Sequence, residues 1–478
     1  MNSFWSIKEI KEAIDRKEVT PEEVVAFFKK RIARYNEKLN AVLEVFDDAI
    51  PSLDAAQKKL GGIPILFKDN ILQKDRIASA GSKILSNYRS CYDATIVARL
   101  KEYGAVPVGR GNMDEFAMGA SGEFSAYGVT RNPYNLDHVP GGSSAGPAAA
   151  VAAGLVPAAI GTETGGSVRQ PACFSGLVGL YPTYGLLSRY GLVAFGSSLD
   201  QAGPLTRTVY DNALLLSVMA GKDIHDATSC DNKGVDYTVG LDGNLPKGFK
   251  IGVIKDALES KGMDPDVAKA FNESLEVLKK RGATISVVDL PHLKYGIAVY
   301  FIITRAEAAS NLYRYDGSLY GARDTEAKEL FDMYLKTRTN NFGAEVKRRI
   351  LVGNYVLSKG HFDAYYHKAQ IVRSIIRTEF EESFKHVDVL MSPTIPTPAF
   401  KIGEMTADPL AMYLADYFTV PNCVIGTPAL SVPCGLTSKG LPMGVQFLGP
   451  KMSESTLYTV AYAYEQASGV QLVPSHFD

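Results

Sequence analysis

Two glycine- and serine-rich segments constrain the fold of this 478-residue chain more than any other feature of the sequence. They read PGGSSAGP (140–147) and GTETGGSVRQP (161–171), and the run AAAVAAGLVPAAI (148–160) lies between them. The alanine-rich part of this run predicts a helix, because alanine has the highest helix propensity. The part that follows, LVPAAIG, predicts a buried strand.

The helix and the strand place the two segments at the same edge of a sheet. We expect Ser143 or Ser144 to cap the helix and Gly154 to end it. A helix that leaves the first segment and a strand that returns to the second bring both segments to the carboxyl end of that strand. Open α/β sheets place their functional sites at this edge.

A lysine is expected at the same edge. The segment GGIPILF (61–67) predicts a short buried strand, and Lys68 follows it directly. If this strand is a parallel neighbour of the first, Lys68, Ser143 and Ser167 converge.

The rest of the chain alternates between predicted helices and strands, which favours the α/β class. Capping residues begin a helix at Thr20, and residues 296–384 form a long helical tract. No repeat or linker marks a domain boundary. We therefore expect one large α/β domain over residues 1–478, with a mixed central sheet and helices on both faces.

Composition excludes several classes of protein. The chain is 46% hydrophobic and 22% charged with a net charge of −1, so it is typical of a globular protein and lacks the basic excess of a strong nucleic-acid binder. Five scattered cysteines without a CxxC pair argue against a disulfide framework or a zinc ribbon. We expect no signal peptide and no membrane span, since residues 147–160 are short and interrupted, and hence a cytoplasmic location. No metal site is expected.

The converging residues could form a nucleophilic centre. A serine needs a base, and only His138 among the seven histidines lies near these segments, where a turn explains it equally well. Lys68 can serve as the base if burial lowers its pKa, with a second serine as proton relay. The run Thr164, Gly165, Gly166 would offer backbone N–H groups to an oxyanion. Phosphate binding is the rival, but neither segment ends in GK[ST].

The same motifs resemble those of the amidase signature family. The resemblance is carried by GIPILFKDN (62–70), GGSSAGPAAAVAAG (141–154) and GTETGGSVRQPACFSGLVGLYPTYG (161–185). It implies the fold of that family and a catalytic triad in which Lys68 is the base, Ser143 follows a cis peptide bond and Ser167 is the nucleophile. Departures such as Glu163, where aspartate is frequent, remove no catalytic side chain.

Four further segments are similar to the glutaminase branch of this family, which works within tRNA-dependent amidotransferases. They are GNMDEFAMGASGEFSAYG (111–128), DHVPGGSSAG (137–146), PTYGLLSRYGLVAFGSSLDQAGP (182–204) and FGAEVKRRILVGNYVLS (342–358). This resemblance implies that Ser167 attacks the side-chain amide of glutamine and that a glutamyl ester forms. The released ammonia would pass to a partner that amidates misacylated tRNA with ATP and Mg²⁺. It also implies a heterotrimer with subunits B and C, in which the partner holds most of the tRNA.

Glutamine is a zwitterion, so its site needs a cation for the α-carboxylate and an anion for the α-ammonium group. Matching positions to the family suggests Arg349 and Asp416 for these roles, with Ser121 and Tyr300 lining the pocket. Arg348 is the alternative to Arg349.

Two other functions stay open. A stand-alone amidase acting on another small amide would share the triad, whereas a non-catalytic scaffold protein would keep only the fold. Whether Glu-tRNA(Gln), Asp-tRNA(Asn) or both are amidated, and by which route ammonia travels, is not determined by the sequence.

Overall fold

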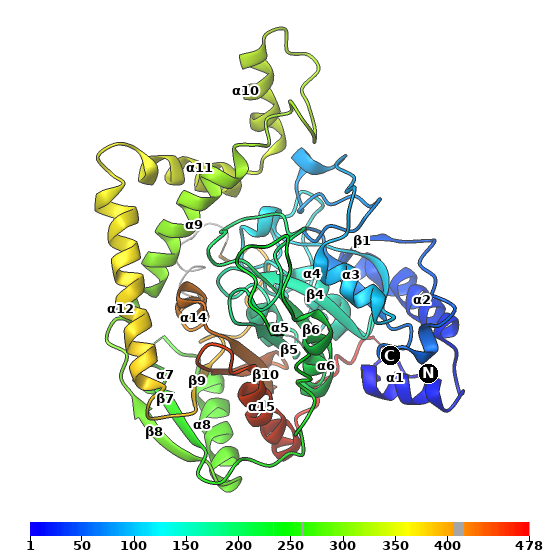
Figure 1. Cartoon of the computed structure of the whole chain (residues 1–478), viewed down its shortest axis with the longest axis vertical. Helices are drawn as coiled ribbons and strands as arrows, with labels where there is room; N and C mark the ends of the chain where they lie inside the picture. Colours follow the sequence, from blue (N-terminus) through cyan, green and yellow to red (C-terminus); the bar gives the residue numbers. More distant parts are fainter. Residues whose placement is uncertain (233, 260–261, 406–414, 478) are drawn as a thin grey trace.

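One mixed sheet of 11 strands runs through the computed structural model, which describes residues 1–232, 234–259, 262–405 and 415–477 (Figure 1). The strand order is β1-β3-β2-β4-β6-β5-β10-β11-β9-β7-β8. The strands are β1 (Val42–Val45), β2 (Pro64–Lys68), β3 (Val106–Gly111), β4 (Ala158–Glu163), β5 (Val178–Tyr181), β6 (Gln201–Thr206), β7 (Lys250–Ile254), β8 (Thr284–Val288), β9 (Val389–Pro393), β10 (Ala429–Leu436) and β11 (Pro442–Leu448). Parallel and antiparallel pairs both occur, which confirms the mixed sheet.

Helices surround the sheet. They are α1 (Ile7–Asp15), α2 (Pro21–Leu39), α3 (Thr95–Glu102), α4 (Ala145–Ala152), α5 (Arg169–Phe174), α6 (Val209–Met219), α7 (Asp256–Glu259), α8 (Pro265–Lys280), α9 (Gly296–Leu312), α10 (Leu330–Asn341), α11 (Ala344–Leu357), α12 (Lys368–Ser383), α14 (Val420–Ile425) and α15 (Glu454–Ser468). Short 3₁₀ turns are η1 (Ala55–Gln57), η2 (Lys83–Leu85), η3 (Glu115–Ala117) and η4 (Leu293–Tyr295), and η5 (Asp363–His367) is a π-helical turn. Within the described ranges, no helix has the length and apolar character needed to cross a membrane.

Apolar clusters pack on both faces of the sheet, as the sequence predicts. Along β2, Ile65 and Phe67 belong to the cluster that contains α6 and α15, whereas Leu66 belongs to the cluster that contains α2 and α4. Successive side chains of a strand point to opposite faces. Because β2 is buried on both faces, its sequence is continuously apolar rather than alternating.

Strands β2 and β4 are parallel neighbours, which is the condition for the predicted convergence of Lys68 with the two serine-rich segments. Strand β2 pairs with β4 in parallel, with Phe67 opposite Ile160, so the chain leaves both strands at the same edge of the sheet. The predicted cap of α4 is wrong in one respect. Ser144 occupies the N-cap position, but its hydroxyl bonds to the backbone of Thr162 instead of capping the helix.

The predicted helical tract over residues 296–384 is interrupted. Helix α9 ends at Leu312, and residues 313–329 form turns and bends before α10 begins. Gly317 and Gly321 adopt left-handed conformations there, which glycine favours. Helix α10 projects from the body of the molecule, and α11 and α12 return along α9 (Figure 1).

Candidate active site

Lys68 ends β2 inside the protein and has no exposed surface. Its Nζ donates to Ser143 Oγ at 2.7 Å and to the carbonyl oxygen of Thr162 at 3.0 Å. Burial lowers the pKa of Lys68 to about 7, although the carboxylates of Asp114, Asp200 and Glu163 act in the opposite direction. The amine can therefore accept a proton near neutral pH.

Backbone contacts position Ser143 for this hydrogen bond. The peptide bond between Gly142 and Ser143 is cis, as the family resemblance implies. The Gly142 N–H donates to Gln170 Oε1 at 3.0 Å, and the Ser143 carbonyl oxygen accepts from the Asp114 N–H at 3.3 Å. Gly142 has no room for a side chain, because a Cβ there would lie 2.1 Å from Asp114 Oδ2.

Ser167 follows β4 on the loop that opens toward α5 and is 7% exposed. Its carbonyl oxygen accepts from the Ser144 N–H at 3.2 Å, which holds the two serine-rich segments together. The Ser167 hydroxyl makes no hydrogen bond to any residue in the described ranges. The structure thus contains the Lys68–Ser143 step of the predicted relay and leaves the Ser143–Ser167 step unformed.

The loop before Ser167 presents unused donors. Among the described residues, the backbone N–H groups of residues 164–167 donate to no acceptor. The carbonyl oxygens of the two glycines are engaged, since Gly165 O accepts from Thr419 Oγ1 at 3.0 Å and Gly166 O accepts from the Gln170 N–H at 2.7 Å. Backbone N–H groups without an acceptor can stabilise an oxyanion where they converge on it.

Both glycines of this loop are required by close neighbours. A Cβ on Gly165 would lie 2.6 Å from the Tyr300 ring. Gly166 has φ of +134°, and a Cβ there would lie 2.6 Å from Thr419 Oγ1 and 3.1 Å from Asp416 Oδ1. The structure therefore brings Tyr300 and Asp416 against the loop that carries Ser167.

The two arginines considered for the carboxylate of glutamine differ in burial. Arg349 is 5% exposed, and its Nε donates to Glu345 Oε1 at 2.7 Å. Arg348 has a 55% exposed side chain and pairs with the other oxygen of Glu345. Of the two, Arg349 is the buried one, and its charge acts to lower the pKa of Asp416.

Asp416 is half-buried, and Ser121 is buried. Burial and the charge of Glu163 raise the pKa of Asp416 to about 8, against the opposing charges of Arg169 and Arg349. Ser121 is fully buried, and its hydroxyl has no hydrogen-bond partner within the described part of the chain. Buried hydroxyl groups usually have a hydrogen-bond partner, and a bound ligand could supply one for Ser121.

A buried ion pair beside the loop was not assigned a role from the sequence. Arg169 and Glu163 are both fully buried, with Arg169 Nε donating to Glu163 Oε1 at 2.8 Å. The other Glu163 oxygen accepts from the Val168 and Arg169 N–H groups. Arg169 also donates to Gln446 Oε1 at 2.6 Å. The only sequence signal for this pair was that both residues lie in the motif GTETGGSVR.

Asp200 and Asp114 were also missed as supports of the site. Asp200 Oδ1 accepts from Thr164 Oγ1 at 2.7 Å, and the backbone N–H groups of Phe195 and Gly196 bond to the same carboxylate. Asp114 accepts from the N–H groups of Gly122 and Phe124. Both lie in segments that carry the family resemblance, but no local pattern indicates their long-range partners.

No metal centre competes with this arrangement. In the residues that the structure describes, no three His, Cys, Asp or Glu side chains are grouped so as to hold a metal ion. His138 forms a β-bridge with Lys401.

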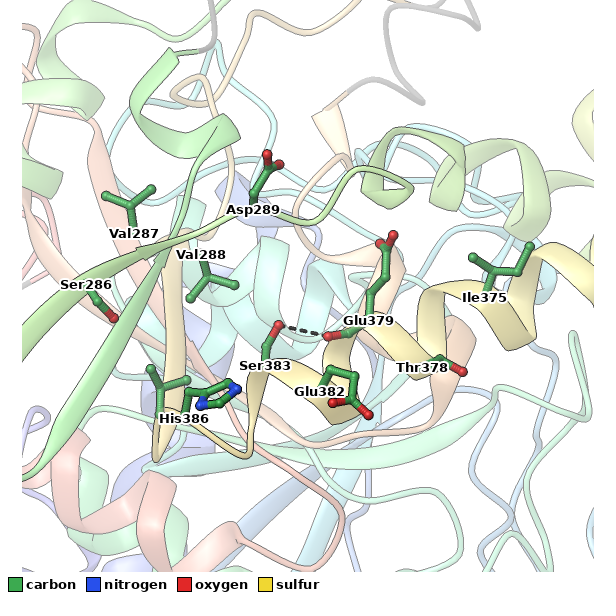
Figure 2. Close-up of a pocket in the computed structure, with 11 residues that line it drawn as sticks. Ser286, Val287, Val288, Asp289, Ile375, Thr378, Glu379, Glu382, Ser383 and His386 are labelled. Carbon is green, nitrogen blue, oxygen red and sulfur yellow. Dashed lines mark hydrogen bonds between the residues drawn. The ribbon is translucent and has the colours of Figure 1, made fainter.

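A cavity of about 610 Å³ lies away from these residues, between the edge strand β8 and α12 (Figure 2). Val287 and Val288 line it from the strand, and Glu379, Ser383 and His386 line it from the side of α12. The Ser383 hydroxyl donates to the Glu379 carbonyl within the helix. The cavity contains none of the predicted site residues.

Comparisons with known proteins give matches over nearly the whole chain. The sequence model of the family described as Amidase matches residues 23–458. The A subunit of glutamyl-tRNA(Gln) amidotransferase from Halothermothrix orenii is 50% identical over 464 residues, 97% of each chain. The crystal structure of the protein of the same name from Thermotoga maritima superimposes with a TM-score of 0.85 at 40% identity, over 99% of this chain and 98% of that one. A peptide amidase from Stenotrophomonas maltophilia has a TM-score of 0.83 at 30% identity, over 99% and 98% of the two chains.

Proposed function

This chain belongs to the amidase family, and we propose that it hydrolyses the side-chain amide of glutamine and supplies the ammonia to a tRNA-dependent amidotransferase. The observation that carries the proposal is the buried Lys68 amine, which donates to Ser143 Oγ at 2.7 Å beside the loop of unused N–H groups. The relatives that share about half of its sequence are named for the amidotransferase.

Ser167 would act as the nucleophile. Its Oγ attacks the amide carbon of glutamine while its proton passes through Ser143 Oγ to Lys68 Nζ. The N–H groups of residues 164–167 would stabilise the negative charge that develops on the amide oxygen. The proton held by Lys68 returns through Ser143 to the leaving nitrogen, and ammonia departs.

A second cycle would release glutamate. Water attacks the glutamyl ester on Ser167 and gives its proton through Ser143 to Lys68. The ester then breaks, and Ser167 recovers its proton along the same path. Lys68 can perform both transfers, because a pKa of about 7 lets it gain and lose a proton near neutral pH.

Glutamine recognition would use the charges of Arg349 and Asp416. The guanidinium of Arg349 suits the α-carboxylate, and Asp416 suits the α-ammonium group. Both charges must be present for a zwitterion, whereas a neutral small amide requires neither. Tyr300 would pack against the substrate, and Ser121 would offer its hydroxyl.

The transfer of ammonia requires partners. We propose a heterotrimer with subunits B and C, in which the partner binds ATP, Mg²⁺ and most of the misacylated tRNA. The net charge of −1 supports this division, because a chain that held tRNA by itself would carry a basic excess.

The alternative is a stand-alone amidase. The likeness to the peptide amidase supports it, but that protein is 30% identical, whereas the amidotransferase protein from Halothermothrix orenii is 50% identical.

Native mass spectrometry of a tagged copy from the source cells distinguishes the two functions. The proposal predicts one-to-one assembly with other subunits, capture of tRNA, and ammonia release from glutamine. A chain found alone or as a homo-oligomer that hydrolyses simple amides would support the stand-alone amidase instead.

A further inference from the structure

The junction between α10 and α11 is held by residues next to the catalytic centre. Glu115 is 4% exposed, and its Oε2 accepts from the Gly343 N–H at 2.8 Å. Its Oε1 accepts from the Ser82 hydroxyl. Phe116 packs on Phe342, with 5.7 Å between the ring centroids, and on Tyr315 at 5.2 Å.

The contact with Glu115 requires a residue without a side chain at position 343. Gly343 occupies the N-cap position of α11, and a Cβ there would lie 2.2 Å from Glu115 Oε2. The residue before a helix commonly supplies a side chain that satisfies the first N–H groups, but glycine has none. The carboxylate of Glu115 thus reaches the start of α11 from a distant part of the chain, where the helix dipole favours a negative charge.

The same helix presents the arginine assigned to glutamine. Within α11, Glu345 binds Arg349 Nε at 2.7 Å, and the Arg349 guanidinium lies 5.4 Å from the centroid of the Phe195 ring. A shift or rotation of the first turn of α11 would move Arg349 relative to Ser167.

Residues 114–116 connect this helix to the triad directly. The Asp114 N–H donates to the Ser143 carbonyl oxygen at 3.3 Å, and the next residue, Glu115, holds Gly343. One short segment therefore contacts both the Lys68–Ser143 pair and the beginning of α11.

We propose that Glu115 is a positioning residue, which fixes α11 to the catalytic core so that Arg349 holds the α-carboxylate of glutamine in register with Ser167. This inference rests on the proposed glutaminase function and deepens it. Glu115 contacts no substrate itself. Its removal should weaken binding of ligands that carry an α-carboxylate and leave binding of those that lack one unchanged.

The test compares two ligands on the chain purified with its native partners. The first is glutamine, for which KM and kcat are measured. The second is 4-aminobutanamide, which is glutamine without the α-carboxylate and is tested as a competitor of glutamine. The variants are Glu115→Ala, which removes the acceptor, and Glu115→Gln, which keeps an acceptor for the Gly343 N–H.

We expect Glu115→Ala to raise KM for glutamine by about tenfold or more, with kcat changed less and the inhibition constant of 4-aminobutanamide within about twofold of wild type. Glu115→Gln should restore most of the loss. If the alanine variant does not fold, Gly343→Ala disturbs the same contact, because its Cβ would lie 2.2 Å from Glu115 Oε2, and it should raise KM for glutamine selectively in the same way. The matched control is Asp264→Ala, which removes a carboxylate that caps α8 far along the sheet. This variant should change neither KM for glutamine nor the inhibition constant of 4-aminobutanamide.

Equal weakening of both ligands would show a general structural role and overturn the inference, as would an unchanged KM in both variants. A wild-type complex that releases no ammonia from glutamine would overturn the proposed function itself, and the inference with it.

Discussion

Lys68 illustrates how burial lowers the pKa of a lysine toward neutrality. A lysine in water has a pKa of about 10.4 and is protonated at neutral pH. Here the side chain has no exposed surface, so the loss of hydration penalises the ammonium form and lowers the pKa to about 7. The strand PILFK that ends in Lys68 predicted this burial, because every residue before the lysine is apolar.

The titration of Lys68 predicts the pH dependence of kcat. The neutral amine is the reactive form, so kcat for glutamine should increase as the pH rises through about 7 and level off above it. Steady-state kinetics at a series of pH values around 7 measure this rise in kcat. Lys68→Met should lose at least about a hundredfold in kcat and show no such rise. A wild-type kcat that stays constant between about pH 6 and pH 8 would contradict the assignment.

Asp416 should control the pH dependence of KM. Its pKa of about 8 means that much of it is protonated at neutral pH, whereas binding of the α-ammonium group needs the carboxylate. KM for glutamine should therefore fall as the pH rises toward 8. Asp416→Asn should have a higher KM that no longer follows this titration. An identical pH profile of KM in both proteins would exclude Asp416 from substrate binding.

Among the elements, β2, α4 and β4 were each predictable because their signals are local. Helix propensity, turn glycines and buried strands are visible in adjacent residues. The parallel pairing of β2 with β4 joins distant segments, and the sequence offered it only as a condition. The supports of the site were not predictable in this way. Asp114, Glu115 and Asp200 act on residues far along the chain, and nothing in their immediate neighbours indicates those contacts.

The loop of residues 164–167 predicts a specific effect of a methyl group added at Gly166. Gly166→Ala places a Cβ 2.6 Å from Thr419 Oγ1 and strains a backbone with φ of +134°, so the N–H groups should move. We expect kcat to fall by about a hundredfold or more.

The matched control is Gly435→Ala in β10. Gly435 has φ of +139°, but a Cβ there would meet nothing within 4 Å. The backbone strain of this variant is similar to that of Gly166→Ala, but it lies in β10 away from the loop, so the activity should stay close to that of the wild type. Equal loss of kcat in both variants, measured as ammonia release, would attribute the effect to general destabilisation instead of the loop.

At the scale of the whole molecule, the mixed sheet and the helices on both faces were predictable, but the order of its strands was not. Strand β10 lies between β5 and β11, so the last hundred residues complete the centre of the sheet. Such pairings depend on contacts between distant segments, which periodicity does not encode. The break at residues 313–329 was missed because a long helical tract gives weak evidence about where it ends.

The buried pair of Glu163 and Arg169 connects several of these distant parts. Arg169 bonds to Gln446 on β11 and to the carbonyl oxygen of Thr419, while Glu163 ends β4. Glu163→Gln leaves the guanidinium without its charge partner and should lower the free energy of unfolding by about 3–5 kcal/mol.

Urea denaturation measures this loss. The control is Glu382→Gln, which breaks the exposed pair with Lys385 and should cost less than about 1 kcal/mol. Similar losses in the two variants would show that the buried pair contributes no more than a surface one.

Covalent capture identifies the nucleophile. The chain, purified with its native partners, is incubated with a glutamine analogue in which a diazoketone replaces the amide, and the modified peptide is identified by mass spectrometry. The account predicts modification of Ser167, and predicts that Ser167→Ala is unmodified and retains less than about one per cent of ammonia release from glutamine. Modification of a different residue, or a Ser167→Ala protein that still hydrolyses glutamine above that level, would contradict it.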